Sequence, residues 1–331
     1  MDVKISIDAM GGDFGPEVTM ESLKQVLGSS LDVRASVFGD SAVLRSLIDG
    51  SFPSDLQSRV DIVHCDTVVD CDEKPSTALR AKQDSSMGQA LSAVATGNSQ
   101  ACISAGNTGA LMALSLLYLG LLPGISRPAI CAEIPTALGN KLMLDLGANV
   151  DCTADQLHQF ALLGSLTANL ALDIDNPSVR LLNVGSESGK GSKLVQSVSQ
   201  LLEDDSSINY QGFVEGDGIF LGQADVIVCD GFSGNVALKV GEGVAKQLSQ
   251  QFAQKPTQGI QSSFLRFFSN LLSSGFNSSI QPSLFNGAYL IGVNGVVVKS
   301  HGAADVEGFT AALHRGINAA RHQLPKALAP I

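Results

Sequence analysis

Strand-like runs alternate along this chain with stretches long enough for a helix, and this alternation restricts the fold more than any other feature. The runs are short and rich in β-branched and apolar residues, and they recur at intervals of roughly 20 to 40 residues. Such spacing predicts repeated β-α units that build a mainly parallel sheet with helices on both faces. The nine runs are Lys4–Ala9, Arg34–Gly39, Val60–His64, Gln100–Ser104, Ala129–Ile134, Leu142–Leu146, Val179–Val184, Asn209–Val214 and Asp225–Cys229.

Several of these runs end in turns rich in Gly, Asn and Ser. In open α/β sheets, ligands bind beyond the carboxyl ends of the strands, where the N-termini of helices offer N–H donors. We therefore expect these turns to form a pocket for an anion. They are Met10–Asp13, Ser104–Gly109, Gly147–Asn149, Val184–Lys190 and Asp230–Asn235.

The chain has 331 residues, enough for one large α/β domain, although two intertwined lobes would also fit. One segment, Gln250–Ser283, departs from the pattern because it is rich in Ser, Gln, Asn and Phe. We predict a single catalytic domain over residues 1–331, with an amphipathic helical insertion at 250–283.

The sequence does not suggest a membrane-spanning or secreted protein. The longest apolar stretch, Ala110–Leu122, is interrupted by polar residues and falls short of the roughly 20 residues that a membrane-spanning helix needs, so it predicts a buried core helix. The first residues lead directly into strand-like sequence, without the basic and apolar regions of a secretory signal. We expect a cytoplasmic protein.

The net charge and the cysteines limit the partners and cofactors that we expect. The formal net charge of −11 argues against nucleic acid, because affinity for a phosphate backbone depends on a basic surface. The six cysteines are scattered, with no C-x-x-C pair and no His at the spacing of a zinc site. We expect reduced thiols, no metal and no cofactor.

Three asparagines, Asn107, Asn149 and Asn235, each follow a strand-like run within a turn that contains glycine. The amide N–H of Asn can orient a carbonyl or phosphate oxygen, but Asn also tolerates the left-handed conformation of a turn. For each asparagine taken alone, the turn is the simpler explanation.

Lys190 stands between two glycines at a predicted helix start. A Lys at a helix N-terminus is electrostatically unfavourable unless an anion neutralises both, so Lys190 is a candidate for binding phosphate or an oxyanion. His301 follows the apolar run Gly295–Val298 and is a candidate proton carrier or donor to substrate, with a structural histidine as the alternative.

Asp8 and Asp13 flank the turn after the first strand-like run. Paired carboxylates at this place could bind a metal or cap the helix that follows. Capping is the simpler role for Asp13, and no other pattern in the chain requires a metal.

The segment 264–272 places apolar residues at i, i+3, i+4, i+7 and i+8. An ordinary core or dimer-interface helix would show the same period. The polar Gln and Ser neighbours favour an exposed apolar face for membrane or partner contact. The residues of this face are Phe264, Leu265, Phe267, Phe268, Leu271 and Leu272.

Long sequence blocks, ordered over almost the whole chain, resemble the phosphate acyltransferase family (PlsX). Their length and order make the match more specific than a lone glycine pattern. Gly216–Ile219 and the amphipathic segment depart from the family's pattern. The matching blocks are Ile7–Pro16, Ala78–Lys82, Ser85–Met87, Ser104–Met112, Asp145–Cys152, Asp230–Val236 and Lys299–Gly302.

The resemblance implies an enzyme that transfers a long acyl group from acyl carrier protein to inorganic phosphate, forming the acyl phosphate used in phospholipid synthesis. It implies a homodimer with a three-layer α/β/α fold and a large mixed, mainly parallel sheet, similar to isocitrate and isopropylmalate dehydrogenases. The matching positions for the catalytic pair are Lys190 and Asn235. With the amphipathic segment, we also expect peripheral membrane contact and a downstream glycerol-3-phosphate acyltransferase as a partner.

Such catalysis must hold phosphate near the thioester carbonyl and stabilise the oxyanion that develops there. We expect Lys190 and the N–H groups of Gly106–Thr108 to hold phosphate, and Asn235 to face the carbonyl oxygen with support from Asn107 and His301. The expected substrate-binding residues are Asp8, Gly11, Gly12, Ser104, Gly106, Asn107, Thr108, Asn149 and His301. Candidate basic contacts for the acidic carrier protein are Lys239, Lys246, Lys255 and Arg266.

Two other functions stay open from the sequence. An NAD-dependent decarboxylating dehydrogenase of related fold is one, because Gly12–Glu17 echoes the early turn of that family, although the arginines that would grip a malate-like acid are dispersed. The other is a non-catalytic phosphate-sensing scaffold at the membrane, which the amphipathic segment and the anion-receptive turns favour. An assay of turnover separates the three.

Overall fold

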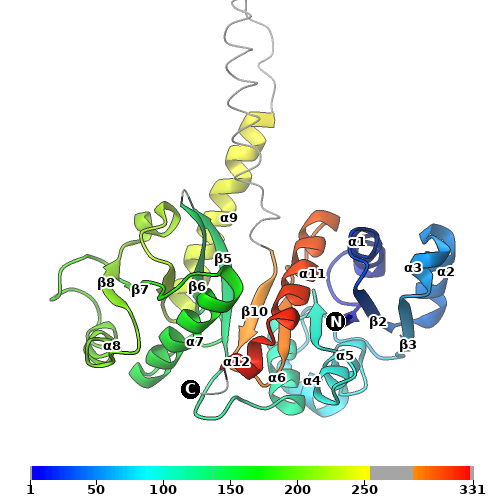
Figure 1. Ribbon diagram of the computed structural model, residues 1–331, viewed down its shortest axis with the longest axis horizontal. Coiled ribbons are helices and arrows are strands. Elements are labelled where there is room, and N and C mark those ends of the chain that lie inside the picture. Colours follow the sequence, from blue (N-terminus) through cyan, green and yellow to red (C-terminus); the bar gives the residue numbers. More distant parts are fainter. Residues whose placement is uncertain (1, 137, 254–285, 329–331) are drawn as a thin grey trace, which may run out of the picture.

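The computed structural model describes the chain except for residues 1, 137, 254–285 and 329–331 (Figure 1). Its strands form one 11-stranded sheet in the order β3-β2-β1-β4-β11-β10-β5-β6-β9-β7-β8. The strands are β1 (Val3–Asp8), β2 (Val33–Gly39), β3 (Val60–His64), β4 (Ala101–Ser104), β5 (Ala129–Thr136), β6 (Gly139–Leu144), β7 (Val179–Leu182), β8 (Tyr210–Val214), β9 (Val226–Val228), β10 (Ala288–Ile291) and β11 (Val296–Lys299).

Helices cover both faces of this sheet and bury two separate hydrophobic cores against it. The first core is packed by α1 (Gly15–Ser29), α2 (Ser41–Ser51), α3 (Ser54–Gln57), α7 (Ala154–Leu172), α8 (Lys193–Asp204), α11 (Val306–Arg321) and α12 (Leu324–Leu328). The second is packed by α4 (Pro75–Ala81), α5 (Ser86–Ala95), α6 (Thr108–Tyr118), the 3-10 helix η1 (Gly216–Leu221) and α9 (Gly231–Ala253). The predicted three-layer α/β/α fold with a mixed, mainly parallel sheet is confirmed.

Alternating side chains along the strands explain the two cores. In β1, Ile5 and Ile7 belong to the first core, while Ser6 and Asp8 point to the other face. In β4, Ile103 belongs to the first core and Cys102 to the second. The period of two that a strand imposes therefore lets a four-residue strand such as β4 hold both helical layers together.

The two ends of the sheet run in opposite directions. Strands β1, β2, β3, β4 and β11 are parallel to one another, and so are β6, β7, β8 and β9. The antiparallel pairs β11–β10, β10–β5 and β5–β6 lie between these two sets and reverse the direction. The five glycine-rich turns therefore lie at two different edges of the sheet, those after β1 and β4 at one edge and those after β6, β7 and β9 at the other.

The helix expected within the apolar stretch Ala110–Leu122 is present as α6. Within the described residues, no helix combines the length and the apolar character that crossing a membrane would require. The predicted insertion at 250–283 and its apolar face lie outside the described residues, apart from its first four residues, which belong to the end of α9. Helix α9 projects away from the body of the molecule (Figure 1).

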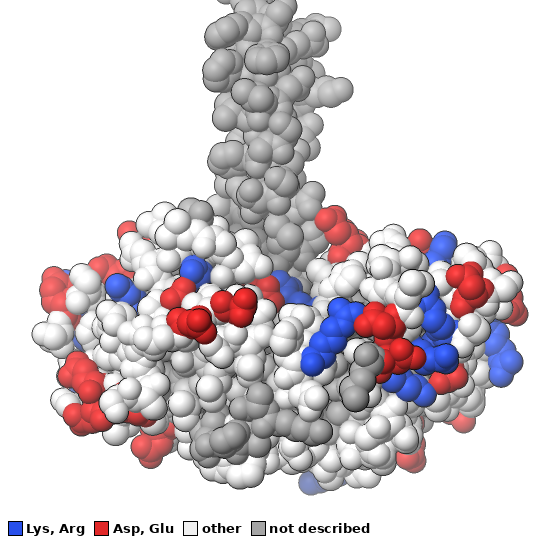
Figure 2. All heavy atoms as spheres, viewed as in Figure 1, with Lys and Arg blue, Asp and Glu red and all other residues white. Residues whose placement is uncertain are grey.

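Charged side chains are unevenly distributed over the face drawn in Figure 2. Lys and Arg gather mainly over the half that carries α1, α2 and α3, where Asp and Glu lie between them. The other half of this face shows mostly Asp and Glu. A chain with a net charge of −11 thus keeps part of its basic surface together.

Candidate active site

A pocket of about 360 Å³ lies on the side of the sheet covered by α4, α5, α6 and α9, at the lower end of the roughly 300 to 1,000 Å³ typical of ligand pockets. The central strands β5, β10 and β11 contribute one wall, and the start of α6 and one side of α9 contribute the others. Its polar lining residues are Thr108, Asn235, Lys239, Glu242, Asn286, Lys299, Ser300 and His301.

Helix α9 begins at Gly231, where the sequence predicted a turn that would extend to Asn235. A Cβ atom on Gly231 would lie 2.5 Å from the carbonyl oxygen of Asn149, and one on Gly234 would overlap the carbonyl oxygen of Asp145. The prediction of a turn was wrong because these glycines serve another purpose. They let the first turns of a helix pack directly against the backbone that follows β6.

Asn235 lies in the second turn of α9 with its side chain beside Gly147. A Cβ atom on Gly147 would be 3.6 Å from the Asn235 side chain, and Gly147 has a φ of +121°, a conformation that other residues rarely adopt. Leu238, Lys239 and Glu242 follow at helical spacing and line the same pocket. Helix α9 therefore presents a continuous row of pocket-lining side chains that begins at the end of β6.

Basic groups also line the pocket. Lys299 ends β11, and its ammonium donates hydrogen bonds to the carbonyl oxygens of Ala105, at 3.2 Å, and Ser300. Burial lowers the pKa of Lys299 to about 8. Nε2 of His301 lies 3.3 Å from Nζ of Lys239. Burial, followed by the charge of Lys239, lowers the pKa of His301, so its ring is neutral near pH 7.

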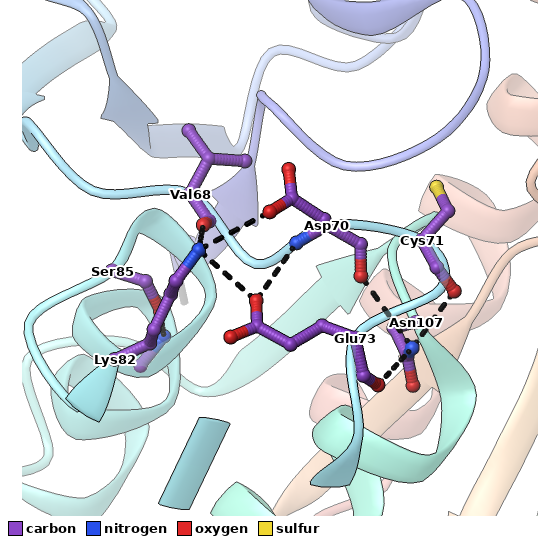
Figure 3. Close-up of polar contacts among 8 residues, drawn as sticks. Val68, Asp70, Cys71, Glu73, Lys82, Ser85 and Asn107 are labelled. Atoms are coloured by element: carbon purple, nitrogen blue, oxygen red, sulfur yellow. Dashed lines mark hydrogen bonds and ion pairs between the residues drawn. The ribbon is translucent and has the colours of Figure 1, made fainter. Parts of the chain in front are cut away.

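Asn107 caps the start of α6 and ties a neighbouring loop to it (Figure 3). Its Oδ1 accepts the N–H of Ala110 at 2.9 Å, and its Nδ2 donates to the carbonyl oxygens of Cys71 and Glu73 at 2.8 and 2.9 Å. The side-chain amide is thus engaged with the protein, and contact of Asn107 with substrate stays a prediction. The next residue, Thr108, lines the pocket.

Lys82 holds the other end of the same loop (Figure 3). Its Nζ donates to the carbonyl oxygen of Val68 at 2.7 Å and lies 3.0 and 3.3 Å from carboxylate oxygens of Glu73 and Asp70. The hydrogen bond to Glu73 is the main cause that raises the pKa of Lys82. Lys82 and Asn107 together fix the loop 68–75 against the start of α6.

Asp8 lies at the end of β1, fully enclosed among hydroxyl groups. The hydroxyls of Ser86 and Ser104 each donate to its carboxylate at 2.7 Å, and the N–H of Gly106 donates to the Ser104 hydroxyl at 3.0 Å. Burial raises the pKa of Asp8. Three predicted substrate-binding residues, Asp8, Ser104 and Gly106, thus form one buried network.

Gly11 and Gly12 let the turn after β1 approach the turn after β4. A Cβ atom on Gly11 would lie 2.6 Å from the backbone nitrogen of Gly106, and one on Gly12 would lie 2.9 Å from Cβ of Ala105. The structure shows a packing role for both glycines, and their contact with substrate stays a prediction.

Asp145 forms a second buried network just beyond the end of β6. Its Oδ1 accepts the N–H groups of Ile130 and Ala148, both at 3.0 Å, and its Oδ2 accepts the backbone and side-chain N–H groups of Asn149 at 2.7 and 2.9 Å. Asn149 also donates to the carbonyl oxygen of Pro128 at 2.8 Å. The amide of Asn149 is buried and engaged, so it links β5 to the turn after β6.

Lys190 lies in the loop between β7 and α8, ahead of the residue that caps α8, Ser192. Its ammonium pairs with the carboxylate of Glu187 at 2.8 Å, and its side chain is about half exposed. The anion that the helix start was expected to need is therefore supplied by the protein itself. Strands β7 and β9 are parallel, so this loop and the base of α9 lie at the same edge of the sheet.

Of the predicted site residues, the structure brings Thr108, Asn235 and His301 together in the pocket. The remainder lie in the two buried networks, in the adjoining turns or, for Lys190, in the loop after β7. Sequence reasoning missed Lys299 and assigned Lys239 only to the surface. A detectable signal was present for Lys239, because residues 235, 238, 239 and 242 share one side of a helix once α9 is known to begin at Gly231.

Solved structures with this fold include phosphotransacetylases. The EutD phosphotransacetylase from Staphylococcus aureus aligns with a TM-score of 0.63 over 97% of this chain and 94% of its own, at 15% identity. A phosphotransacetylase from Streptococcus pyogenes aligns with a TM-score of 0.64 at 17% identity, also over 97% and 94%. A 4-hydroxythreonine-4-phosphate dehydrogenase from Burkholderia phymatum gives 0.54 over 96% of this chain and 98% of its own, at 15% identity. These structures share the fold, which also occurs among dehydrogenases as expected.

Sequence relatives are far more similar. A family model described as a fatty acid synthesis protein matches residues 3–327. Proteins named phosphate acyltransferase from Saccharophagus degradans and Pseudomonas syringae pv. syringae are each 45% identical over 324 residues, which is 98% of this chain and 94% and 95% of the relatives. One from Nitrosococcus oceani is 44% identical over 326 residues, 98% of this chain and 95% of its own. The chain therefore belongs to the phosphate acyltransferase family and is an acyltransferase.

Proposed function

We propose that this enzyme transfers a long acyl group from the thioester of acyl carrier protein to inorganic phosphate and so forms the acyl phosphate that feeds phospholipid synthesis. One observation carries the proposal. A single pocket is lined by Asn235, beside the turn after β6, and by the basic groups of Lys239, Lys299 and His301. A thioester carbonyl and an inorganic anion need these two kinds of partner.

The reaction requires one bond to form and one to break. An oxygen of phosphate attacks the thioester carbonyl carbon, the carbonyl oxygen becomes an oxyanion, and the carbon–sulfur bond then breaks to release thiolate. A thiol with a pKa near 8.5 leaves readily and takes its proton from solvent, so little acid catalysis is needed. The Asn235 amide N–H is proposed to donate to the oxyanion.

Lys190 is proposed as the second member of the catalytic pair. Its loop lies at the same edge of the sheet as the base of α9, and its ammonium is accessible because only Glu187 pairs with it in the described structure. Exchange of Glu187 for an anionic substrate group would bring the charge of Lys190 to the reaction.

The test is an assay of carrier-protein thiol release from palmitoyl acyl carrier protein, with and without phosphate. Release by the wild type should depend on phosphate. Asn235→Ala should reduce turnover by roughly 10²- to 10³-fold, as expected for loss of one oxyanion donor, and Lys190→Ala should also abolish most acyl phosphate formation. Both variants should keep the wild-type circular dichroism spectrum. Wild-type turnover in both would refute the assignment of the pair.

The two other functions suggested by the sequence are set aside by the family to which the chain belongs. The dehydrogenase shares the fold at low identity, but its family is not the one that the chain matches over residues 3–327. The scaffold lacks catalysis, whereas the chain is an acyltransferase.

The proposal also includes contacts of the enzyme with carrier protein, with the membrane and with a second subunit. An acidic carrier protein fits the basic side chains gathered over α1, α2 and α3 in Figure 2, in addition to Lys239 and Lys246 on α9. Lys255, Arg266 and the apolar face that includes Phe268 lie outside the described residues. Phe268→Glu is expected to weaken flotation of the protein with liposomes. A cytoplasmic homodimer, bound peripherally to membrane and coupled to a glycerol-3-phosphate acyltransferase, completes the proposed setting.

A further inference from the structure

Three basic side chains converge on the pocket from two elements of an acidic chain. Lys299 ends β11, His301 lies two residues further on, and Lys239 of the pocket-lining row on α9 lies 3.3 Å from Nε2 of His301. Like charges repel, so placing two ammonium groups around one small pocket costs free energy unless anions neutralise them. Glu242 pairs with Lys239 at 2.7 Å, whereas no carboxylate among the described residues pairs with Lys299. The arrangement therefore indicates that the ligand of this pocket is an anion.

The contact between His301 and Lys239 brings two hydrogen-bond donors together. Nδ1 of His301 accepts the N–H of Ala303 at 3.1 Å, so the proton of the neutral ring resides on Nε2. Nε2 in turn lies 3.3 Å from the ammonium of Lys239, which can only donate. Two donors thus face each other, and an oxygen of an anion placed beside both would accept from both.

The Lys299 ammonium has one more N–H group than its two hydrogen bonds use. An ammonium carries three N–H groups, and two are directed at the carbonyl oxygens of Ala105 and Ser300. Within the described part of the chain, Lys299 forms no ion pair with a carboxylate. The two carbonyl oxygens hold the ammonium in one orientation, and Lys299 lines the pocket without a paired carboxylate.

We propose that Lys299, Lys239 and His301 form the binding site for the attacking phosphate, with Lys299 as its principal charged contact. This inference rests on the proposed function and adds to it the location of the inorganic substrate. Phosphate then lies at the β11 end of the pocket, and the thioester carbonyl lies toward Asn235 at the β6 end. Thr108 at the start of α6 lines the same pocket and adds the positive end of a helix dipole.

Phosphate binding at this site should depend on pH through Lys299. The groups that act on its charge are Cys71, Asp8 and Asp13, which favour the ammonium, and Lys239, which opposes it. Burial outweighs the three favourable neighbours and lowers the pKa of Lys299 to about 8 in the empty pocket. The part of the affinity that the Lys299 ammonium contributes should be fully present well below that pH and should be lost as pH rises through it.

Calorimetric titration of the full chain with inorganic phosphate, without acyl carrier protein, tests the site directly. Lys299→Met should weaken phosphate binding by about 10- to 100-fold, the loss expected for a hydrogen bond between charged groups. Lys239→Met should weaken it by a smaller factor, because this side chain is about half exposed and already pairs with Glu242. Lys299→Arg should restore part of the affinity. The matched control is Lys24→Met, which removes a lysine on α1 that pairs with Glu21.

Steady-state kinetics separates substrate binding from a structural role. The inferred site requires a raised KM for phosphate in Lys299→Met, with the KM for acyl carrier protein within about twofold of wild type. A variant that only disturbs the fold would change both values. If Lys299→Met fails to fold, Lys239→Met carries the same test.

Unchanged phosphate affinity in both Lys299→Met and Lys239→Met would overturn the inference. Wild-type protein that does not bind phosphate at all would overturn it as well. Protein that binds phosphate in a Lys299-dependent way but releases no thiol from palmitoyl carrier protein would refute the proposed function and leave the anion site standing.

Discussion

Asp8 and Asp145 are both buried carboxylates at the ends of strands, but hydroxyl groups supply most of the donors to Asp8, and backbone N–H groups supply most of those to Asp145. Asp8 accepts from the hydroxyls of Ser86 and Ser104 and from one backbone N–H group, that of Met10. Asp145 accepts from three backbone N–H groups and from the side-chain amide of Asn149. Burial raises the pKa of both carboxyl groups.

This difference decides how each network responds to change. A hydroxyl can rotate and can either donate or accept, so the network around Asp8 can be rearranged when its centre is altered. A backbone N–H points in a fixed direction and can only donate. The network around Asp145 should therefore be rigid and should not tolerate substitution of Asp145. The network around Asp8 should be able to rearrange when Asp8 is substituted.

The largest effect is expected from Asp145→Asn. One carboxylate oxygen would be replaced by an NH₂ group that faces N–H donors, so donors on both sides would be left unsatisfied in a buried site. We expect a loss of about 3 kcal/mol in the free energy of unfolding, measured by urea denaturation. Asp61→Asn, at an exposed position on β3, is the control and should stay within about 0.5 kcal/mol of wild type.

Asp8→Asn should cost less, about 1 kcal/mol, in the same measurement. The Asn carbonyl can accept from one hydroxyl, and its NH₂ group can donate to the other after that hydroxyl rotates. An equal or larger cost than for Asp145→Asn would show that the hydroxyls cannot rearrange and would remove the contrast between the two networks.

The difference between local signals and long-range contacts explains how much of the fold the sequence could predict. Nine of the strands were found because β-branched runs and turns are local signals. Strands β10 and β11 were missed although β4, β7 and β9 are as short or shorter, and their antiparallel pairing, which reverses the sheet, is a long-range property. Because the reversal depends on that pairing, nothing local in the sequence showed that the five turns divide between two edges of the sheet.

The site was predicted less well for a related reason. Asn235 and His301 were identified by residue type and by resemblance to a family. The roles of Asn107 and Asn149 as engaged structural amides depend on contacts with residues 34 to 37 and 21 positions away, which no local pattern reports. Glycines at 231 and 234 suggested a turn because close packing and turn geometry select the same residue.

Lys82→Met tests a third kind of network, in which a flexible cation holds the loop 68–75. The partners left behind are acceptors that water can reach, since the carboxylate of Asp70 is largely exposed. We therefore expect a loss below about 1 kcal/mol in unfolding free energy. Limited proteolysis should cut this loop faster in the variant than in wild type, and unchanged cleavage would show that Asn107 alone holds it.

The smallest expected effect links the Asp8 network to the pocket. The negative charge of Asp8 favours the ammonium of Lys299, so Asp8→Asn should lower the pKa of Lys299 below its value of about 8. Affinity for phosphate, which requires the ammonium, would then begin to fall at a lower pH, by on the order of half a pH unit. Calorimetric titrations across a pH series for wild type, Asp8→Asn and Asp61→Asn measure this shift. Coincident pH profiles for all three would mean that the buried carboxylate of Asp8 acts on the architecture of its strand end and has no influence on the charge in the pocket.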